Sequence, residues 1–135
     1  MIKLVLAALA FAIATPLLPA PEFQLSTHVL DTTSGTPGVG VAVLLERKSD
    51  AGTWKQVSKA ITGANGRFGD FLPLDGTKSN RGTYRLTFDL EKYFKAKGVT
   101  TVFPEAVVVF KITDETHYHI PVVVTPFAIS TYRGS

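Results

Sequence analysis

Short stretches with the two-residue period of half-buried β-strands recur along the chain. In the clearest of them, 83–89, Tyr84, Leu86 and Phe88 would share one face, and polar residues occupy the other. Clusters of glycine, proline and small polar residues separate these stretches, as expected of turns. The pattern predicts strands over 25–31, 39–46, 53–62, 83–89, 106–112, 118–125 and 127–132.

The period changes once, directly after Asp89. Leu90, Tyr93 and Phe94 have the spacing of one face of a helix. Asp89 is a suitable cap for the start of this helix, and Gly98 is a suitable end. Short, regularly spaced strands with a single short helix predict an all-β sandwich.

Two connections carry turn signals of different kinds. Asn65-Gly66 predicts a tight turn, since both residues accept the positive φ angles that hairpin turns require, and Arg67 follows directly. The polar segment TDET at 113–116 lies between two predicted strands. It predicts a hairpin, which would pair the strands on either side of it.

The strand predicted over 118–125 has an unusual outward face. Its inward face is apolar throughout and suits a core. The outward face is partly apolar and would be poorly placed in open water. Because a small sandwich has no layer of helices to cover this face, we expect a second copy of the chain there. The outward residues are His117, His119, Pro121 and Val123.

An apolar run, LVLAALAFAIATPLLPA, lies near the N-terminus. It is too short to span a bilayer as a stable helix, which needs about 20 apolar residues, and a proline interrupts its continuation. We interpret 1–20 as a signal peptide, with cleavage after Ala14 or Ala20. The remaining domain, 21–135, would then be periplasmic or secreted, with no membrane anchor.

Composition narrows the remaining choices. The 135 residues suffice for one domain with a real core, and 45% hydrophobic against 19% charged residues indicates a folded chain. The net charge of +3 falls to +2 without Lys3, and the basic residues are scattered, so no nucleic-acid partner is expected. The absence of cysteine excludes disulfides, thiolate metal sites and thiol nucleophiles.

The three histidines are the first candidates for chemistry. His117 and His119 are two apart on a predicted strand, so their side chains would point the same way, and His28 lies on another strand. They could be ordinary surface histidines. They could also form a three-nitrogen zinc site, or perform metal-free acid–base hydrolysis beside an arginine. Spacing alone does not separate these alternatives.

The C-terminal residues have strand character instead of a polar tail. Thr131 and Tyr132 are a β-branched and aromatic pair, which indicates that this end is held in place rather than frayed. Arg133 lies among residues that are otherwise suited to packing. The carboxylate of Ser135 could accept a charged hydrogen bond from an arginine.

Four segments in order resemble one known family. LSTHVLDTTSGTPG at 25–38, NGR at 65–67, HYHIP at 117–121 and YRGS at 132–135 are similar to the 5-hydroxyisourate hydrolases, the transthyretin-related enzymes of urate breakdown. The resemblance spans 23–135. It implies an all-β, transthyretin-like β-sandwich of two antiparallel sheets with one short helix. It also implies a homotetramer with active sites between paired dimers.

The resemblance also implies an activity that needs no metal or cofactor. This is the hydrolytic opening of the cyclic amide in 5-hydroxyisourate, which gives 2-oxo-4-hydroxy-4-carboxy-5-ureidoimidazoline in purine catabolism. His117 would be a supporting residue only. The implied catalytic residues are His28, Arg67 and His119, and the implied substrate-binding residues are His28, Arg67, Tyr132, Arg133, Gly134 and Ser135.

We expect a division of labour within this set. His119, with help from His28, would orient and deprotonate water, while Arg67 stabilises negative charge on the substrate. Ser135 and the terminal backbone would complete the pocket. The alternatives are a transthyretin-like ligand carrier without activity, and a periplasmic β domain in which His28, His117 and His119 hold zinc. The export signal leaves open where the substrate would be made.

Overall fold

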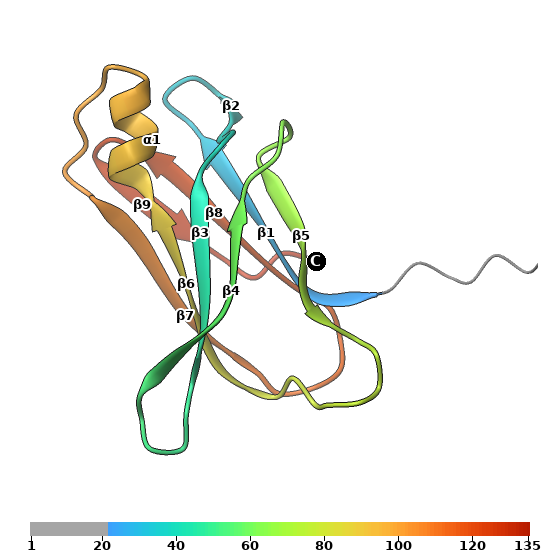
Figure 1. The fold of residues 1–135 in the computed structure, drawn as a ribbon. Helices are drawn as coiled ribbons and strands as arrows, with labels where there is room; N and C mark the ends of the chain where they lie inside the picture. Colours follow the sequence, from blue (N-terminus) through green and yellow to red (C-terminus); the bar gives the residue numbers. More distant parts are fainter. Residues whose placement is uncertain (1–21) are drawn as a thin grey trace, which may run out of the picture.

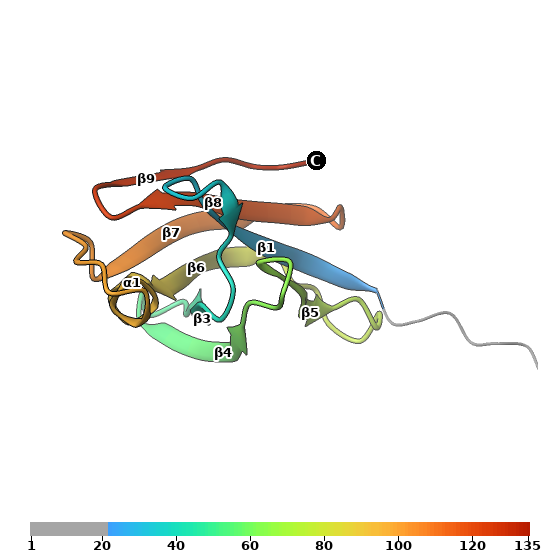
Figure 2. The same cartoon turned by 90° about the horizontal axis from the view of Figure 1, so that it is seen from above.

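Two β-sheets pack face to face in the computed structural model, which describes residues 22–135 (Figures 1 and 2). The expected signal peptide, 1–20, lies outside the described residues. The strands are β1 Phe23–Asp31, β2 Thr36–Pro37, β3 Ala42–Lys48, β4 Trp54–Ile61, β5 Arg67–Pro73, β6 Gly82–Asp89, β7 Glu105–Ile112, β8 Tyr118–Thr125 and β9 Ala128–Thr131, and the helix is α1 Leu90–Ala96. The prediction of an all-β sandwich with one short helix is confirmed.

The strands divide into a mixed sheet and an antiparallel sheet. In sheet A the order is β2-β1-β8-β9. β5 also pairs with β1, along Phe23 to His28, whereas β2 pairs with Leu30 and Asp31. In sheet B the order is β4-β3-β6-β7. All pairs are antiparallel except β1 with β8, which run parallel from Leu25 beside Tyr118 to Asp31 beside Val124. The prediction of two wholly antiparallel sheets therefore needs this one correction.

The hairpin predicted at 113–116 is wrong, whereas the tight turn predicted at Asn65-Gly66 is present, with the Gly66 amide donating to the Gly63 carbonyl at 2.8 Å. β7 pairs with β6 in sheet B, whereas β8 pairs with β1 and β9 in sheet A, so 113–116 crosses between the sheets. The Asn65-Gly66 turn also leads from sheet B to sheet A, because β5 pairs with β1. Gly66 has the expected positive φ of 73°, but Asn65 does not. Its side chain instead accepts a hydrogen bond from the Arg67 amide at 3.0 Å.

The helix begins and ends where the sequence predicts. The Asp89 side chain accepts a hydrogen bond from the Lys92 amide, and Leu90, Tyr93 and Phe94 are buried. Gly98, at φ 70°, donates to the Lys95 carbonyl at 3.0 Å. The apolar face of α1 thereby joins the core between the two sheets.

A buried carboxylate ties this helix to sheet A. Asp31, at the end of β1, is 1% exposed. Its Oδ2 accepts a hydrogen bond from the Tyr93 hydroxyl at 3.0 Å and pairs with the Lys97 ammonium at 3.1 Å. Because a buried charge without such partners is costly, this network fixes the position of α1 relative to β1.

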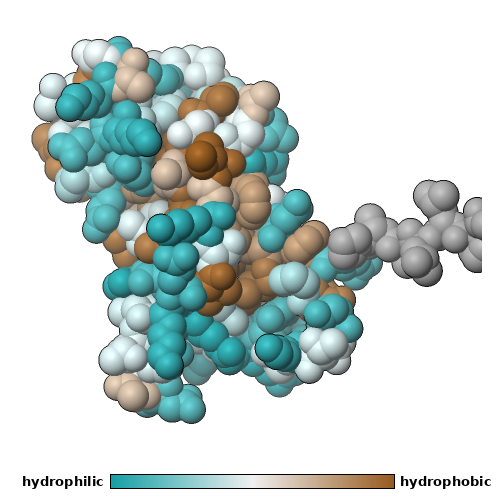
Figure 3. Space-filling view, in the orientation of Figure 1, coloured by the Kyte–Doolittle hydropathy of each residue, from teal (hydrophilic) through white to brown (hydrophobic). Residues whose placement is uncertain are grey.

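The surface carries scattered apolar residues and no spanning helix. On the face seen in Figure 3, hydrophobic patches are interrupted by hydrophilic residues. Among the described residues, no helix is long and apolar enough to cross a membrane. Several exposed hydrophobics lie on or beside edge strands, including Val107 and Val109 on β7 and Phe127 before β9. Such edges are available for pairing with other chains.

Candidate active site

Sheet A brings three predicted catalytic residues together on its outer face. The parallel pairing places Ser26 beside His119 and His28 beside Pro121. The antiparallel pairing with β5 places Arg67 opposite His28. An Arg67 guanidinium nitrogen, Nη1, lies 3.4 Å from Nε2 of His119. Residues far apart in the sequence thus form one cluster of two imidazoles and a guanidinium.

Glycine is required immediately before Arg67. The Val29 amide donates to the Gly66 carbonyl at 2.8 Å, which brings the turn against β1. A Cβ atom at Gly66 would lie 2.6 Å from the Val29 carbonyl oxygen and 2.9 Å from Cβ of Pro37. Only glycine permits this approach at its positive φ. The turn that contains NGR therefore positions Arg67 by packing against β1.

A serine hydroxyl links the two histidines of the HYH segment. Ser26 Oγ lies 2.8 Å from Nε2 of His117 and 2.8 Å from Nδ1 of His119. Nδ1 of His117 lies 2.9 Å from the Phe23 carbonyl. Ser26 was not among the predicted site residues. The sequence signal was its place two residues before His28, which puts both side chains on the same face of β1.

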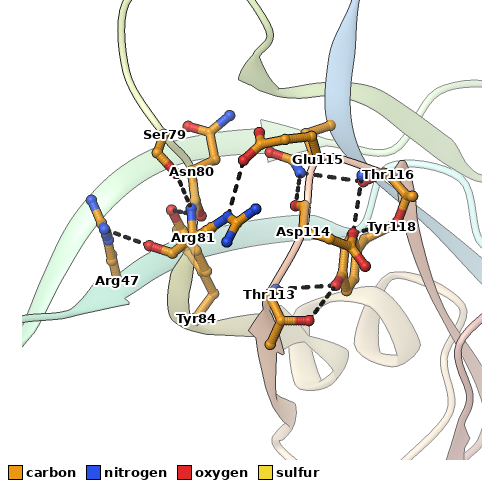
Figure 4. A network of polar contacts seen from close by, with 11 residues as sticks. Arg47, Ser79, Asn80, Arg81, Tyr84, Thr113, Asp114, Glu115, Thr116 and Tyr118 are labelled. Atoms are coloured by element: carbon orange, nitrogen blue, oxygen red, sulfur yellow. Dashed lines mark hydrogen bonds and ion pairs between the residues drawn. The ribbon is translucent and has the colours of Figure 1, made fainter.

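The loop that leads into β8 is held independently of these histidines. Arg81 and Glu115 form an ion pair at 3.1 Å between this loop and the loop before β6 (Figure 4). Nε2 of the buried Gln24 donates to the carbonyls of Asp114 and Thr116 at 2.7 and 3.2 Å. These contacts fix the entry to β8 and hence the register of the histidine pair.

Burial and neighbouring positive charge lower the pKa values of His28 and His119. Burial lowers the pKa of His119 below that of an ordinary histidine, and the neighbouring Arg67, His28 and His117 lower it further. Burial and Arg67 also lower the pKa of His28, against an opposing hydrogen bond with the Asn65 backbone. Neutral imidazoles can accept protons at physiological pH.

The C-terminal segment returns along β8 and meets the site (Figure 2). Gly134 pairs with His119, and its amide donates to the His119 carbonyl at 2.8 Å. A Cβ atom at Gly134 would lie 2.6 Å from Cδ2 of the His119 ring. A side chain at this position would therefore displace the imidazole. This contact gives the glycine of YRGS a physical role.

The other terminal residues have contacts of a different kind. The Arg133 guanidinium lies 4.2 Å from the centre of the Tyr118 ring and donates to the Thr116 hydroxyl at 3.2 Å. Tyr132 is exposed. Within residues 22–135, the Ser135 carboxylate forms no ion pair with an arginine. The end is held in this chain by Gly134 and Arg133 instead.

The three histidines do not fit a zinc site. The Ser26 hydroxyl lies between His117 and His119, and His119 faces Arg67, whose positive charge would oppose a bound cation. In the part of the chain that the structure describes, no group of three potential ligands is arranged to hold a metal ion. The arrangement suits proton transfer beside a fixed positive charge.

The fold and the site together define a two-sheet sandwich with a histidine–arginine acid–base centre on one outer face. The HIUase/Transthyretin family model matches residues 25–134. The chain belongs to this family.

Curated relatives share about two fifths of their residues with this chain. The 5-hydroxyisourate hydrolase of Mus musculus is 40% identical over 113 residues, which cover 82% of this chain and 94% of that protein. The 5-hydroxyisourate hydrolase of Salmonella typhi is 40% identical over 132 residues, which cover 95% and 94%. Both are matched over nearly their whole length.

Solved structures of two kinds share the fold. The Klebsiella pneumoniae 5-hydroxyisourate hydrolase is 36% identical with a TM-score of 0.68, over 82% of this chain and 98% of that one. Sea bream transthyretin in complex with thyroxine is 29% identical with a TM-score of 0.76, over 82% and 94%. The fold alone therefore does not separate a carrier from a hydrolase, and the site residues must decide.

Proposed function

We propose that this chain hydrolyses 5-hydroxyisourate to 2-oxo-4-hydroxy-4-carboxy-5-ureidoimidazoline in urate breakdown. The observation that carries the proposal is the contact of Arg67 with Nε2 of His119 on the face that also holds His28. The curated relatives named above support the substrate, since they are 5-hydroxyisourate hydrolases.

The chemistry divides between a base and a fixed cation. His119 Nε2 takes a proton from water as the water oxygen bonds to the ring carbonyl carbon, and the carbonyl electrons move to its oxygen. Arg67 stabilises this oxyanion. When the carbon–nitrogen bond then breaks, the nitrogen receives the proton from His119, and the products are a carboxylic acid and an N–H group. A base of this kind contributes about 10²- to 10⁴-fold to the rate.

His28 is suited to holding the substrate or the water. Its Nε2 is buried and has no hydrogen-bond partner among the described residues. A buried polar atom without a partner is costly, so a bound polar ligand would relieve this cost. We therefore assign His28 to substrate or water binding beside Arg67, with a secondary share in proton transfer.

The terminal residues would complete the pocket between copies of the chain. β7 and β9 are edge strands of their sheets, and Phe127 and Tyr132 beside β9 are exposed. These features support association into the homotetramer that the family resemblance implies. Sedimentation equilibrium at assay concentration tests the assembly, and a monomer with full activity would contradict it.

The N-terminal run supports export, with 1–20 as a signal peptide removed after Ala14 or Ala20. N-terminal sequencing of the protein recovered from the exported fraction of its source cells tests both the location and the cleavage site. Recovery of the uncleaved chain from the cytoplasm alone would contradict the proposal.

The activity has a direct test. Urate oxidase generates 5-hydroxyisourate from urate, and the absorbance decay is followed with and without this chain. We expect the chain to accelerate the decay, and His119→Ala to lose most of the acceleration. A chain that retains a hydrophobic ligand tightly but leaves the decay unchanged would be a carrier instead.

A further inference from the structure

Two side chains beside His119 have no part in the reaction described so far. Ser26 Oγ and His117 form a continuous chain of hydrogen bonds from the Phe23 carbonyl to the His119 ring. The distances are 2.9, 2.8 and 2.8 Å in that order. A fourth contact, at 3.4 Å, continues from His119 to Arg67. The direction of this chain can be worked out from its two ends.

The first end is a carbonyl, which can only accept. Nδ1 of His117 must therefore carry a hydrogen, and when the ring carries only this hydrogen, Nε2 must accept. The Ser26 hydroxyl has one hydrogen, so it donates this hydrogen to His117. Ser26 Oγ can then only accept from His119, which places a hydrogen on Nδ1 of His119.

The second end is a guanidinium, which can only donate. Arg67 Nη1 faces Nε2 of His119, so this nitrogen must offer a lone pair. The same tautomer of His119 therefore follows from either end of the chain. Because both ends require the same tautomer, the donor and the acceptor of every hydrogen bond in the chain are defined.

We propose that Ser26 and His117 are positioning residues that hold His119 with its hydrogen on Nδ1 and its lone pair on Nε2. This inference rests on the proposed function of His119 as the base. With the opposite tautomer, a hydrogen on Nε2 would point at the Arg67 guanidinium, and the ring could not accept a proton there. The chain of hydrogen bonds therefore selects the reactive form.

A purely structural role for these two residues is less consistent with the contacts. The loop before β8 is already held by Gln24 and by the ion pair of Arg81 with Glu115. The pairing of β1 with β8 continues for seven residues. Removal of the two hydrogen bonds of Ser26 Oγ, one exposed and one part-buried, should thus leave the fold and the strand register intact.

The tautomer is measured directly with ¹⁵N-labelled histidine, by two-bond correlations between ring nitrogens and carbon-bound hydrogens. In the wild-type chain without substrate, we expect His119 to show the hydrogen on Nδ1. In Ser26→Ala we expect a mixture of tautomers or the opposite one. A wild-type spectrum with the hydrogen on Nε2 would overturn the proposal, whether or not the chain is a hydrolase.

Kinetics supply the second measurement. Ser26→Ala should lower kcat about 10- to 100-fold with KM changed less than about twofold, because an incorrectly protonated base slows the chemical step. Ser26→Thr keeps the hydroxyl and should restore most of kcat. If Ser26→Ala keeps both the wild-type tautomer and kcat while the wild-type enzyme is active, the positioning role is wrong and the proposed function stands.

A pair of substitutions tests the other member. His117→Gln retains a carbonyl oxygen that can accept from Ser26, whereas His117→Ala offers no acceptor. We expect the glutamine variant to keep the wild-type His119 tautomer and a kcat at least about fivefold above that of the alanine variant. Equal kcat values with equal tautomers would contradict the proposal. These variants and Ser26→Thr carry the test if Ser26→Ala fails to fold.

Discussion

The outer faces of the two sheets differ in how their polar groups are organised. On sheet A, hydrogen bonds join Ser26, His117, His119 and Arg67 into one cluster, and Gly134 is tied to it. On sheet B, a groove of about 780 Å³ is lined by residues of β3, β4 and β6, and Ile61 within it is 66% exposed. The groove holds carboxylates and a lysine but no linked acid–base pair. The presence of a groove is therefore a poor guide to function in this fold, and a hydrogen-bonded group of titratable side chains is a better one.

Removal of the two central side chains of sheet A should have the largest effect on hydrolysis. His119→Ala and Arg67→Ala should each lower kcat/KM by about 10²- to 10⁴-fold, through loss of the base and of oxyanion stabilisation respectively. Thermal unfolding should be unchanged. The matched control is Ile61→Ser in the sheet B groove, which should hydrolyse at the wild-type rate. Near wild-type hydrolysis by His119→Ala would remove the assignment of the base.

The chain end offers a smaller change at the same site. Gly134→Ala should lower kcat about tenfold or more. The new alanine Cβ would lie 2.6 Å from Cδ2 of His119, so the imidazole ring would have to move. Gly69→Ala, where nothing lies within 4 Å of the new Cβ, is the control and should keep full activity. Deletion of 132–135 should cost at least as much as Gly134→Ala. Full activity after this deletion would show that the terminal segment is dispensable.

The Asp31 network separates stability from activity. Asp31→Asn should lower the free energy of unfolding by about 1–3 kcal/mol, because it weakens the hydrogen bonds to Tyr93 and Lys97, and activity at low temperature should remain. Burial alone would raise the pKa of Asp31, but bonds from Lys97, Tyr93 and Thr33 hold it below the ordinary value of an aspartate. The stability from Asp31 is therefore present above pH 3.8 and is lost as the pH falls through the lower, folded-state pKa.

Urea denaturation at pH 7 and below pH 3 checks this sign. The difference between wild type and Asp31→Asn should be largest at pH 7 and should shrink in acid. A difference that grows in acid would contradict the assigned network.

The smallest expected effect is in the pH profile. Because burial and Arg67 lower the pKa of His119, kcat/KM should stay constant from pH 8 down past 6.5, and should fall only at lower pH. Arg67→Met should move this acid limb upward, since one source of the lowered pKa is removed. The measurement is the initial rate between pH 5 and 8. A higher enzyme concentration makes the low activity of the variant measurable. An acid limb above 6.5 in the wild type would mean that the base is another group.

The local sequence pattern predicted where strands and the helix lie better than it predicted which strands pair. The alternation of Tyr84, Leu86 and Phe88 and the capping by Asp89 are read within a few residues, and the structure confirms β6 and α1. The parallel pairing of β1 with β8 has no local signal, because a period of two is the same whichever strand lies alongside. The hairpin at 113–116 was wrong for this reason.

The site was predicted from resemblance, and its internal connections were not. His28, Arg67 and His119 were grouped by their motifs, and the structure shows that they share one face. Ser26 was overlooked because a serine on a strand is chemically unremarkable until its neighbours are known. Its importance depends on two nitrogens that lie 91 and 93 positions away in the sequence.

These long separations have a consequence for the time course of folding. Sheet B is made largely of strands that pair with a near neighbour in the chain, β3 with β4 and β6 with β7. Contacts between β1 and β8 require closure of a loop that contains nearly all of the intervening domain, and such closure is slow. We expect hydrolysis to return after the bulk of the β-structure in a refolding experiment followed by circular dichroism and activity together. The return of hydrolysis would then mark completion of the fold, and a folding intermediate with sheet B alone would contain β-structure but would not hydrolyse the substrate.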